Sequence, residues 1–278
     1  MVIKIFPLLI ILAVSTLYGQ PDINWEREQP TAKTALHLFH SKQVVNFPTS
    51  ETLKSGEFEY EISHRFLPAI DGENVMFGID GPAHIRMALA YAITDRMMIN
   101  LGRSNASDNI DLRVKYRLWE KDHSLLPLSV AARAGGAWST EVINRDKSDS
   151  KNIQYYGQAI FNTLIKKKVG IGVVPSYLYN SHIYCQETQD SFTLGSYIQV
   201  YLTSMLSIYA ETNTTISGWR QYHNPVSLGI ELETGGHFFK IFVGNSSHLN
   251  PSQYLAGADK KFGSYTRLGF NITRILTF

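Results

Sequence analysis

The chain ends on the stretch Leu268-Gly269-Phe270-Asn271-Ile272-Thr273-Arg274-Ile275-Leu276-Thr277-Phe278, in which apolar and polar side chains alternate. A period of two residues fits a β-strand, because successive side chains of a strand point to opposite faces. Arg274 interrupts the apolar face near the strand end, where its long side chain reaches water. The stretch predicts the closing strand of an outer-membrane barrel. Its signal, which we expect the barrel-assembly machinery to contact, consists of Phe270, Ile272, Leu276 and Phe278.

The first twenty residues predict export. Lys4 is the single charge before an apolar run at 5–14, and Gly19 and Gln20 follow as a small-residue exit. That run is half the roughly 20 residues that a membrane-spanning helix needs. We therefore expect 1–20 to be a cleaved signal peptide, although Leu17 is larger than the usual residue before a cleavage site. No cysteine follows the run, so no lipoprotein anchor is expected.

The composition excludes several classes of protein. Of the 278 residues, 26 are basic and 24 acidic, so no electrostatic footprint for nucleic acid is present. The single cysteine, Cys185, excludes an internal disulfide. No further segment approaches the length of a membrane helix, which excludes a helical membrane protein. A membrane β-barrel remains open, because only alternate residues of its strands face lipid.

Twelve alternating segments predict an all-β fold, a single up-and-down antiparallel transmembrane β-barrel over residues 57–278. The cleanest strand, at 110–118, sets five apolar residues against Asp111, Arg113, Lys115 and Arg117. The predicted strands are 57–66, 83–93, 96–103, 110–118, 127–135, 153–165, 169–179, 192–202, 205–214, 226–234, 237–244 and 268–278. Residues 21–56 contain no clean alternation, and we predict either a periplasmic N-terminal segment or a lumen plug.

The connections between these strands alternate in length. Tight polar turns are predicted at 94–95, 166–168, 203–204 and 235–236, with a middling one at 119–126. Longer links are predicted at 67–82, 104–109, 136–152, 180–191, 216–225 and 245–261. Outer-membrane barrels have short periplasmic turns and long extracellular loops. An even number of strands then places both termini in the periplasm of a Gram-negative cell.

Charged side chains on the second face predict a hydrated or plugged lumen, because twelve strands enclose more space than wall side chains fill. The predicted lumen-lining charges are Arg86, Arg113, Lys115, Arg117, Glu211, Glu231 and Glu233. They either line a conducting path or neutralise one another in a closed interior. Gly170 and Gly172, on the same face, leave room for a plug or a bulky opposing side chain. The alternative fold is a secreted β-sandwich with these charges at its surface.

Four phrases resemble an uncharacterised outer-membrane barrel family, the domain of unknown function numbered 5777, found mainly in Bacteroidetes-type bacteria. They are Ser63-His64-Arg65-Phe66, Phe77-Gly78-Ile79-Asp80, Gly102-Arg103-Ser104 and the stretch 112–117 with its Lys115-Tyr116-Arg117. The resemblance spans nearly the whole mature chain. It implies a β-barrel in the outer membrane and supplies no activity or catalytic residues.

The same phrases supply a candidate rim site of His64, Arg65, Asp80 and Arg103. Each lies at the predicted extracellular end of one of the first three strands. We predict that Asp80 pairs with Arg65 or Arg103 and fixes the first long loop. The functional interpretation is a contact for an anion or a sugar acid at the mouth. The structural interpretation is a rim ion pair with no ligand.

The sequence favours a pore or transport role for small solutes, with outer-membrane lipid as the surrounding partner. The main rival is a non-conducting barrel that acts as a scaffold or partner anchor. An outer-membrane hydrolase is a remote alternative, because no nucleophile, base and orienting group occur at useful spacing. His37 and His40 have no third ligand in view, so neither a metal nor a cofactor is expected.

Overall fold

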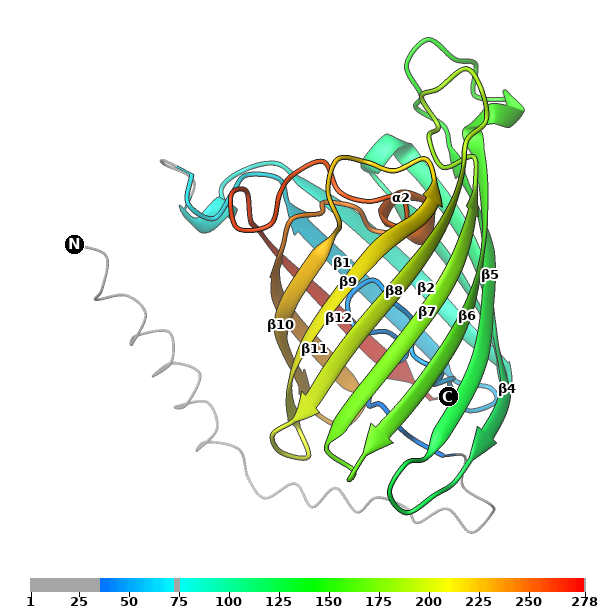
Figure 1. Ribbon diagram of the computed structural model, residues 1–278, viewed down its shortest axis with the longest axis vertical. Helices are drawn as coiled ribbons and strands as arrows, with labels where there is room; N and C mark the ends of the chain where they lie inside the picture. The colour runs from blue at the N-terminus through cyan, green and yellow to red at the C-terminus, as the bar shows by residue number, and fades with distance from the viewer. Residues whose placement is uncertain (1–35, 73–75, 278) are drawn as a thin grey trace, which may run out of the picture. The chain divides into compact units, whose positions relative to one another are not determined.

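Twelve strands form one closed antiparallel barrel (Figure 1). The computed structural model describes residues 36–72 and 76–277; the predicted signal peptide at 1–20 and residues 21–35 lie outside this range. The strands are β1 (Phe58–Phe66), β2 (Ala83–Thr94), β3 (Met97–Ser104), β4 (Asn109–Lys121), β5 (Leu128–Ser139), β6 (Ile153–Ile165), β7 (Val169–Tyr179), β8 (Asp190–Tyr201), β9 (Leu206–Gly218), β10 (Val226–Glu233), β11 (His237–Gly244) and β12 (Arg267–Leu276). The predicted twelve-stranded up-and-down barrel is confirmed.

Each strand pairs with its neighbours in the sequence, and β12 pairs with β1 to close the ring. Ile62 lies opposite Ile272 of β12 and Met87 of β2. Closure satisfies the backbone groups of every strand, which a hydrocarbon environment requires. Of the predicted closing signal, Phe270, Ile272 and Leu276 lie in β12; Phe278 is outside the described residues.

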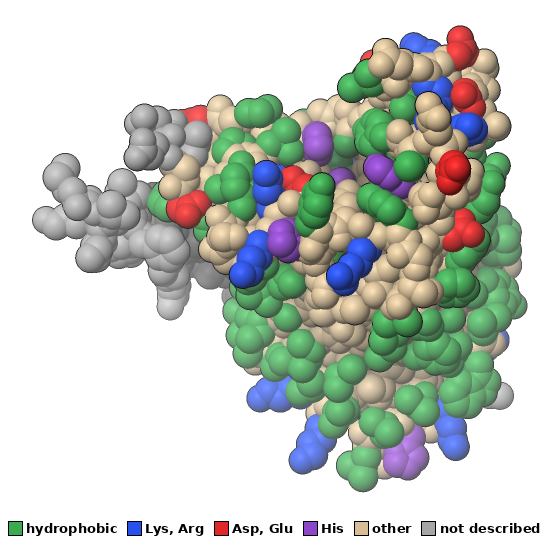
Figure 2. Space-filling view, turned by 45° about the horizontal axis from the view of Figure 1, so that its top comes forward, with side chains coloured by type: hydrophobic (Ala, Val, Ile, Leu, Met, Phe, Trp, Pro, Cys, Tyr) green, Lys and Arg blue, Asp and Glu red, His purple; other side chains and the backbone are tan. Residues whose placement is uncertain are grey.

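The strands alternate as the sequence predicts, with an apolar outer face and a charged inner face. In β4, Leu112 is 52% exposed, whereas its neighbours Asp111 and Arg113 are 1% and 6% exposed. Figure 2 shows hydrophobic side chains over the barrel wall and charged side chains towards its two ends. A surface of this kind suits lipid around the wall and water at the rims. No helix among the described residues is long and apolar enough to cross a membrane.

The connections follow the predicted asymmetry with one exception. The β3–β4 link, predicted as long, has only the residues 105–108, most of them in a 3₁₀ turn, η2 (Ala106–Asp108). It is shorter than the β4–β5 link on the opposite end, 122–127, because the β3–β4 ladder extends to Ser104 opposite Asn109. The remaining helical turns are η1 (Met76–Gly78), η3 (Ser150–Asn152) and α2 (Pro251–Tyr254). By the length rule, the end that carries α2 and the longest links is extracellular.

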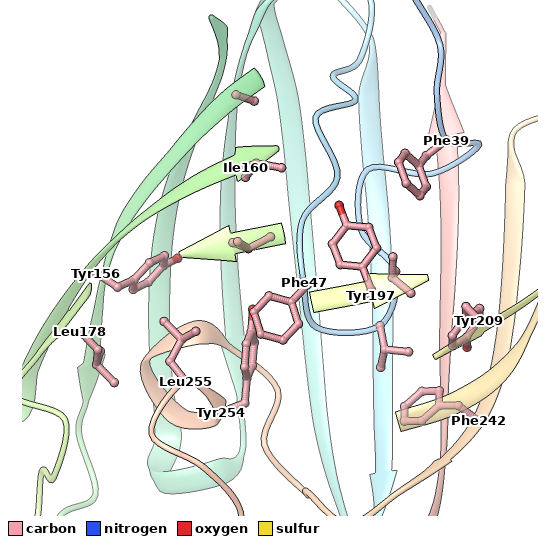
Figure 3. Packing of buried hydrophobic residues seen from close by; sticks show 14 of the residues in the cluster. Phe39, Phe47, Tyr156, Ile160, Leu178, Tyr197, Tyr209, Phe242, Tyr254 and Leu255 are labelled. Atoms are coloured by element: carbon pink, nitrogen blue, oxygen red, sulfur yellow. The ribbon is translucent and has the colours of Figure 1, made fainter. Parts of the chain in front are cut away.

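Two segments fill the interior of the barrel. The first is the lumenal segment, defined here as residues 36–53, whose Leu38, Val44 and Phe47 are at most 2% exposed. The second is the capping loop, residues 245–266, which carries α2. Figure 3 shows Phe47 of the lumenal segment beside Tyr254 and Leu255 of the capping loop, within a ring of inward-facing wall residues. The apolar core therefore lies inside the barrel and is built from these two insertions and from inward-facing residues of the wall.

We predict that a charge in the middle of the outer face destabilises the barrel. Ile230 lies at the centre of β10, opposite Ile208 and Ile241, and all three side chains are exposed. Ile230→Arg should lower the free energy of unfolding by about 2–4 kcal/mol in lipid vesicles, because arginine at mid-depth must leave water.

The measurement is equilibrium unfolding in urea, with refolding into the same vesicles. Leu125→Arg, in the 122–127 turn, is the control and should cost at most about 1 kcal/mol. Equal losses for the two variants would mean that the wall of β10 does not contact hydrocarbon.

Candidate functional site in the barrel lumen

The inner wall is densely charged, and its charges are buried. Six of the seven predicted lumen-lining residues are at most 6% exposed: Arg86, Arg113, Lys115, Arg117, Glu211 and Glu231. The seventh, Glu233, lies half-buried at the end of β10 and bonds to no residue of the lumenal segment in the described chain. Buried charges are costly unless they are paired and hydrogen-bonded. The geometry of the lumen therefore depends on where each of these groups finds its partner.

Part of the compensation comes from ion pairs within the wall. The Asp111 carboxylate lies 2.7 Å from Arg86 Nη2 and 3.0 Å from Arg113 Nε. Arg86 also reaches Glu61 at 3.5 Å and donates to Asn100 Oδ1 at 2.8 Å. This cluster on β1–β4 neutralises charges between neighbouring strands. The predicted neutralisation of Arg113, Lys115 and Arg117 by Glu231 and Glu233 across the interior does not occur among the ion pairs of the described residues.

Glu211 of β9 binds a turn of the lumenal segment. Its carboxylate accepts hydrogen bonds from the backbone N–H groups of Val45, Asn46 and Phe47, at 3.0–3.3 Å. The Asn46 side-chain amide adds a fourth donor at 2.7 Å. Three consecutive N–H groups that converge on one oxygen pair form an anion-binding nest. The wall supplies the anion, and the segment supplies the nest.

Lys240 and Glu231 form a second attachment point, between β10 and β11. Lys240 Nζ lies 3.1 Å from Glu231 Oε2. It also donates to the carbonyl oxygens of Gln43 and Val44, and to Ser41 Oγ at 2.7 Å. Ser41 in turn donates to Glu231 at 2.8 Å. The ammonium group thus binds one wall carboxylate and two carbonyl groups of the segment at the same time.

Basic residues of β4 bind the last part of the lumenal segment. Lys115 Nζ donates to the carbonyl oxygens of Lys42 and Thr49, at 3.0 and 3.2 Å. Arg117 donates to Thr52 Oγ1 at 2.6 Å and lies 3.7 Å from Glu51. Burial alone would raise the pKa of Glu51. The hydrogen bond and charge of His37, together with the charge of Arg117, instead hold that pKa below its ordinary value.

Aromatic side chains of the segment occupy places where the wall has glycine. A Cβ atom at Gly170 would lie 2.6 Å from the Phe39 ring, and one at Gly195 would lie 2.1 Å from the Phe47 ring. Gly172 instead leaves room for the wall residue Tyr197, whose ring would be 2.0 Å away. Both predicted uses of Gly170 and Gly172, space for an inserted segment and for a bulky opposing side chain, therefore occur.

The capping loop closes the extracellular end of the barrel. Gln154 Nε2 donates to Ser252 O at 3.0 Å, and Asn213 Nδ2 donates to Leu255 O at 2.6 Å. Tyr254 donates to Asn46 O and makes an edge contact with Phe47, with ring centres 5.3 Å apart. The two insertions therefore meet inside the barrel. Beside Lys42 and Gln43 of the lumenal segment, a cavity of about 30 Å³ lies among charged wall residues, with room for about one or two water molecules.

The four predicted rim residues do not form one site. Arg65 faces the lumen, where it donates to Asn271 Oδ1 at 2.7 Å and to Asn46 Oδ1 at 3.2 Å. His64 faces outward and stacks on Phe270 with ring centres 4.9 Å apart. Neighbouring residues of a strand point to opposite faces, so His64 and Arg65 are separated by the wall.

The predicted ion pair of Asp80 is also wrong. Arg103 faces outward and pairs with Asp108 in η2, and no ion pair of Asp80 occurs among the described residues. The Thr140 hydroxyl and the Arg103 guanidinium hold the pKa of Asp108 below its usual range. Alternation places Arg103 on the outer face, where the nearest acid follows in the short β3–β4 link. A binding role for the individual rim residues stays a prediction.

The residues that hold the lumenal segment were only partly found from the sequence. Alternation identifies Glu211 and Glu231, but their partners Ser41 and Asn46 lie in a stretch without period. His37, considered for a metal, binds Glu51 through Nδ1 at 2.9 Å. Across residues 36–72 and 76–277, no group of three His, Cys, Asp or Glu side chains is arranged to hold a metal ion.

Comparison with known proteins agrees with this fold. A family described as a membrane-bound beta barrel domain, DUF5777, matches residues 39–276. An outer-membrane channel from Pseudomonas putida F1 has 12% identity and a TM-score of 0.51, over 82% of this chain and 98% of that chain. The NanC porin has 8% identity and a TM-score of 0.48, over 80% and 99%. The KdgM porin has 10% identity and a TM-score of 0.47, over 80% and 99%. No curated protein matches the chain. At such identities the likeness concerns the fold alone.

We predict that Glu211→Ala loosens the lumenal segment while the barrel stays closed. The substitution leaves three buried N–H groups without their acceptor, each of which costs about 1–3 kcal/mol. Amide hydrogen exchange at Val45, Asn46 and Phe47 should therefore accelerate at least about tenfold.

Glu233→Ala is the matched control, because it removes a glutamate that does not contact the segment. It should leave exchange at these positions within about twofold of the parent. Unchanged exchange in Glu211→Ala would show that the nest does not hold the segment.

Proposed function

Since the chain belongs to the family of membrane-bound β-barrel domains matched over residues 39–276, we propose that it is an outer-membrane pore for small solutes. In this proposal, the lumenal segment and the capping loop close the pore, and solutes cross when these two insertions shift. The proposal assigns no catalytic step to any residue.

The observation that carries the proposal is the polarity of the inner wall. Twelve strands enclose more space than the wall's own side chains fill, so such a lumen is either wet or plugged. The wall facing the insertions carries Glu59, Arg86, Lys115, Arg133 and Gln199, all buried. When the insertions move away, water hydrates these groups, and the apolar wall residues around them, such as Tyr197 and Phe242, become exposed as well. The bonds that hold the segment are polar and exchange readily for bonds to water.

The distribution of charge supports a preference for anions in the open state. Basic side chains outnumber acidic ones among the buried charged residues of the described wall. They concentrate on β1–β5, at Arg65, Arg86, Arg113, Lys115, Arg117 and Arg133. Of the buried wall acids, Glu59, Glu61 and Asp111 lie on the same strands, where they offset only part of this charge, and Glu211 and Glu231 lie on β9 and β10. Rings of charged side chains set ion preference in pores, and an excess of arginine and lysine favours anions.

A non-conducting scaffold is the second candidate. The many hydrogen bonds and ion pairs between the lumenal segment and the wall favour it, because each of them must break before the lumen opens. The conductance measurement described below distinguishes the pore from the scaffold.

We predict that loosening the segment increases conductance in planar lipid bilayers. The double variant Glu211→Ala, Lys240→Ala removes both attachment points at β9–β11 and should open more often than the parent protein. In a gradient of potassium chloride, its reversal potential should indicate preference for chloride. Glu233→Ala, which leaves the attachments intact, should behave as the parent.

Folding is verified for each variant by heat-dependent migration on gels, since a misfolded barrel would also fail to conduct. If neither the parent nor the double variant shows conductance steps while both are folded, the pore is excluded and the scaffold is favoured.

A further inference from the structure

The extracellular end of the barrel contains a pocket beside the capping loop. Its volume is about 230 Å³, and its lining comes from β2, β5, β6, η2, the 180–189 and 219–225 links and the capping loop. Figure 2, which tilts this end towards the viewer, shows several histidines there, among hydrophobic, uncharged and charged side chains. About eight water molecules would occupy such a volume, which matches a single small ring rather than a drug-sized ligand.

Unpartnered polar atoms concentrate in the lining. Six lining residues carry a buried side-chain nitrogen or oxygen atom that no group of the described chain satisfies: Gln154 Oε1, Ser181 Oγ, His182 Nδ1, Gln221 Oε1, His248 Nδ1 and Gln253 Oε1. Gln154 is only 1% exposed, and its Nε2 is fixed by Asn180 O and Ser252 O. Its Oε1 is therefore an acceptor held in place. Buried polar groups in proteins are nearly always hydrogen-bonded, so such a concentration indicates a ligand with several donors.

The lining also offers flat apolar surface. The rings of His182 and Trp219 are stacked, with centres 4.2 Å apart and planes 8° apart. Tyr184 lies at the same pocket and shares a hydrogen bond with Ser107 at 2.8 Å. Stacked rings of this kind contact ligands that have one apolar face and polar edges.

Among the described residues, no lysine, arginine, aspartate or glutamate lines the pocket. Of its histidines, His84 is fixed by a bond to Ser247 O at 3.0 Å. Burial lowers the pKa of His248 to about 4, and the charge of Asp259 offsets only part of that effect, so His248 is neutral at neutral pH. A charged ligand would lose its hydration here without gaining a counter-ion.

We propose that this pocket binds a neutral saccharide, one hexopyranose ring at a time. The hydroxyl groups of the sugar donate to the three glutamine oxygens, and its apolar face packs against the aromatic rings. An anionic sugar acid, the ligand considered for the predicted rim site, is disfavoured here because the described lining supplies no cation.

The inference names a neutral solute for the proposed pore, whose wall charge sets the preference among ions only. The passage of the bound sugar through the barrel is the one part that rests on that function. Binding and conduction are measured separately, so each proposal fails on its own experiment. A free sugar and the terminal ring of a surface glycan share the recognised chemistry, and the experiment includes both.

The test is saturation-transfer NMR on the full-length protein in a polyoxyethylene detergent, because detergents with sugar headgroups would compete. The probes are the methyl glycosides of glucose, galactose and mannose, N-acetylglucosamine, glucuronate and purified lipopolysaccharide. We expect at least one neutral sugar, free or as part of the lipopolysaccharide, to bind, and glucuronate to bind at least about tenfold more weakly than the free glycoside of glucose.

Two variants and a control locate the site. Gln221→Leu removes an acceptor that receives no hydrogen bond from the described chain, and should weaken binding about three- to tenfold. Trp219→Ala should weaken it more. Tyr222→Ala removes an aromatic residue of the same link that is 87% exposed and outside the pocket, and should leave affinity unchanged.

Absence of binding for all neutral probes would overturn the inference. It would also be overturned if binding survived unchanged in both Gln221→Leu and Trp219→Ala, or if glucuronate bound more tightly than the neutral sugars.

Discussion

The burial of charge on the inside of the barrel is the constraint on which the rest of the structure depends. Lipid requires an apolar outer face, and alternation then places the polar residues of every strand on the inner face. In a barrel of twelve strands these residues cannot all reach one another across the lumen. Arg86 and Asp111 pair within the wall, but Glu211 and Lys240 are satisfied mainly by backbone groups of residues 43–47. The lumenal segment is therefore part of the electrostatic balance of the wall.

Because the buried wall charges depend on the lumenal segment, the stability of the closed barrel is connected to its proposed function. The hydrogen bonds and ion pairs that hold the segment can be replaced by bonds to water. The apolar part of the interior includes the contact of Phe47 with Tyr254, between the two insertions, and wall residues such as Tyr197. Movement of one insertion is consequently coupled to the other through that contact. Opening at the periplasmic side and release of the capping loop would then be linked events in a pore.

The sequence was sufficient for the barrel because alternation is a local property. All twelve strands, the closure through Phe270 and Ile272, and the inward direction of Arg113 and Glu231 follow from a period of two. The lumenal segment has no period, and its position depends on contacts over more than 100 residues, such as Asn46 with Glu211. The predicted rim site is wrong for a different reason. It joins four polar residues that lie near the same end of their strands, although alternation places His64 and Arg65 on opposite faces of the wall. The pocket at the extracellular end is formed by links that are distant in sequence, so no local pattern predicts it.

The central claim is that hydrocarbon covers the outer face while the inner face is enclosed. Spin labels at Ile208, Ile230 and Ile241, three outward positions paired across β9–β11, test it directly in lipid vesicles. Power-saturation EPR should find all three labels accessible to oxygen, which dissolves in the bilayer, and protected from a water-soluble nickel complex. Labels that the nickel complex relaxes as freely as one at Tyr222 in the 219–225 link would contradict the account.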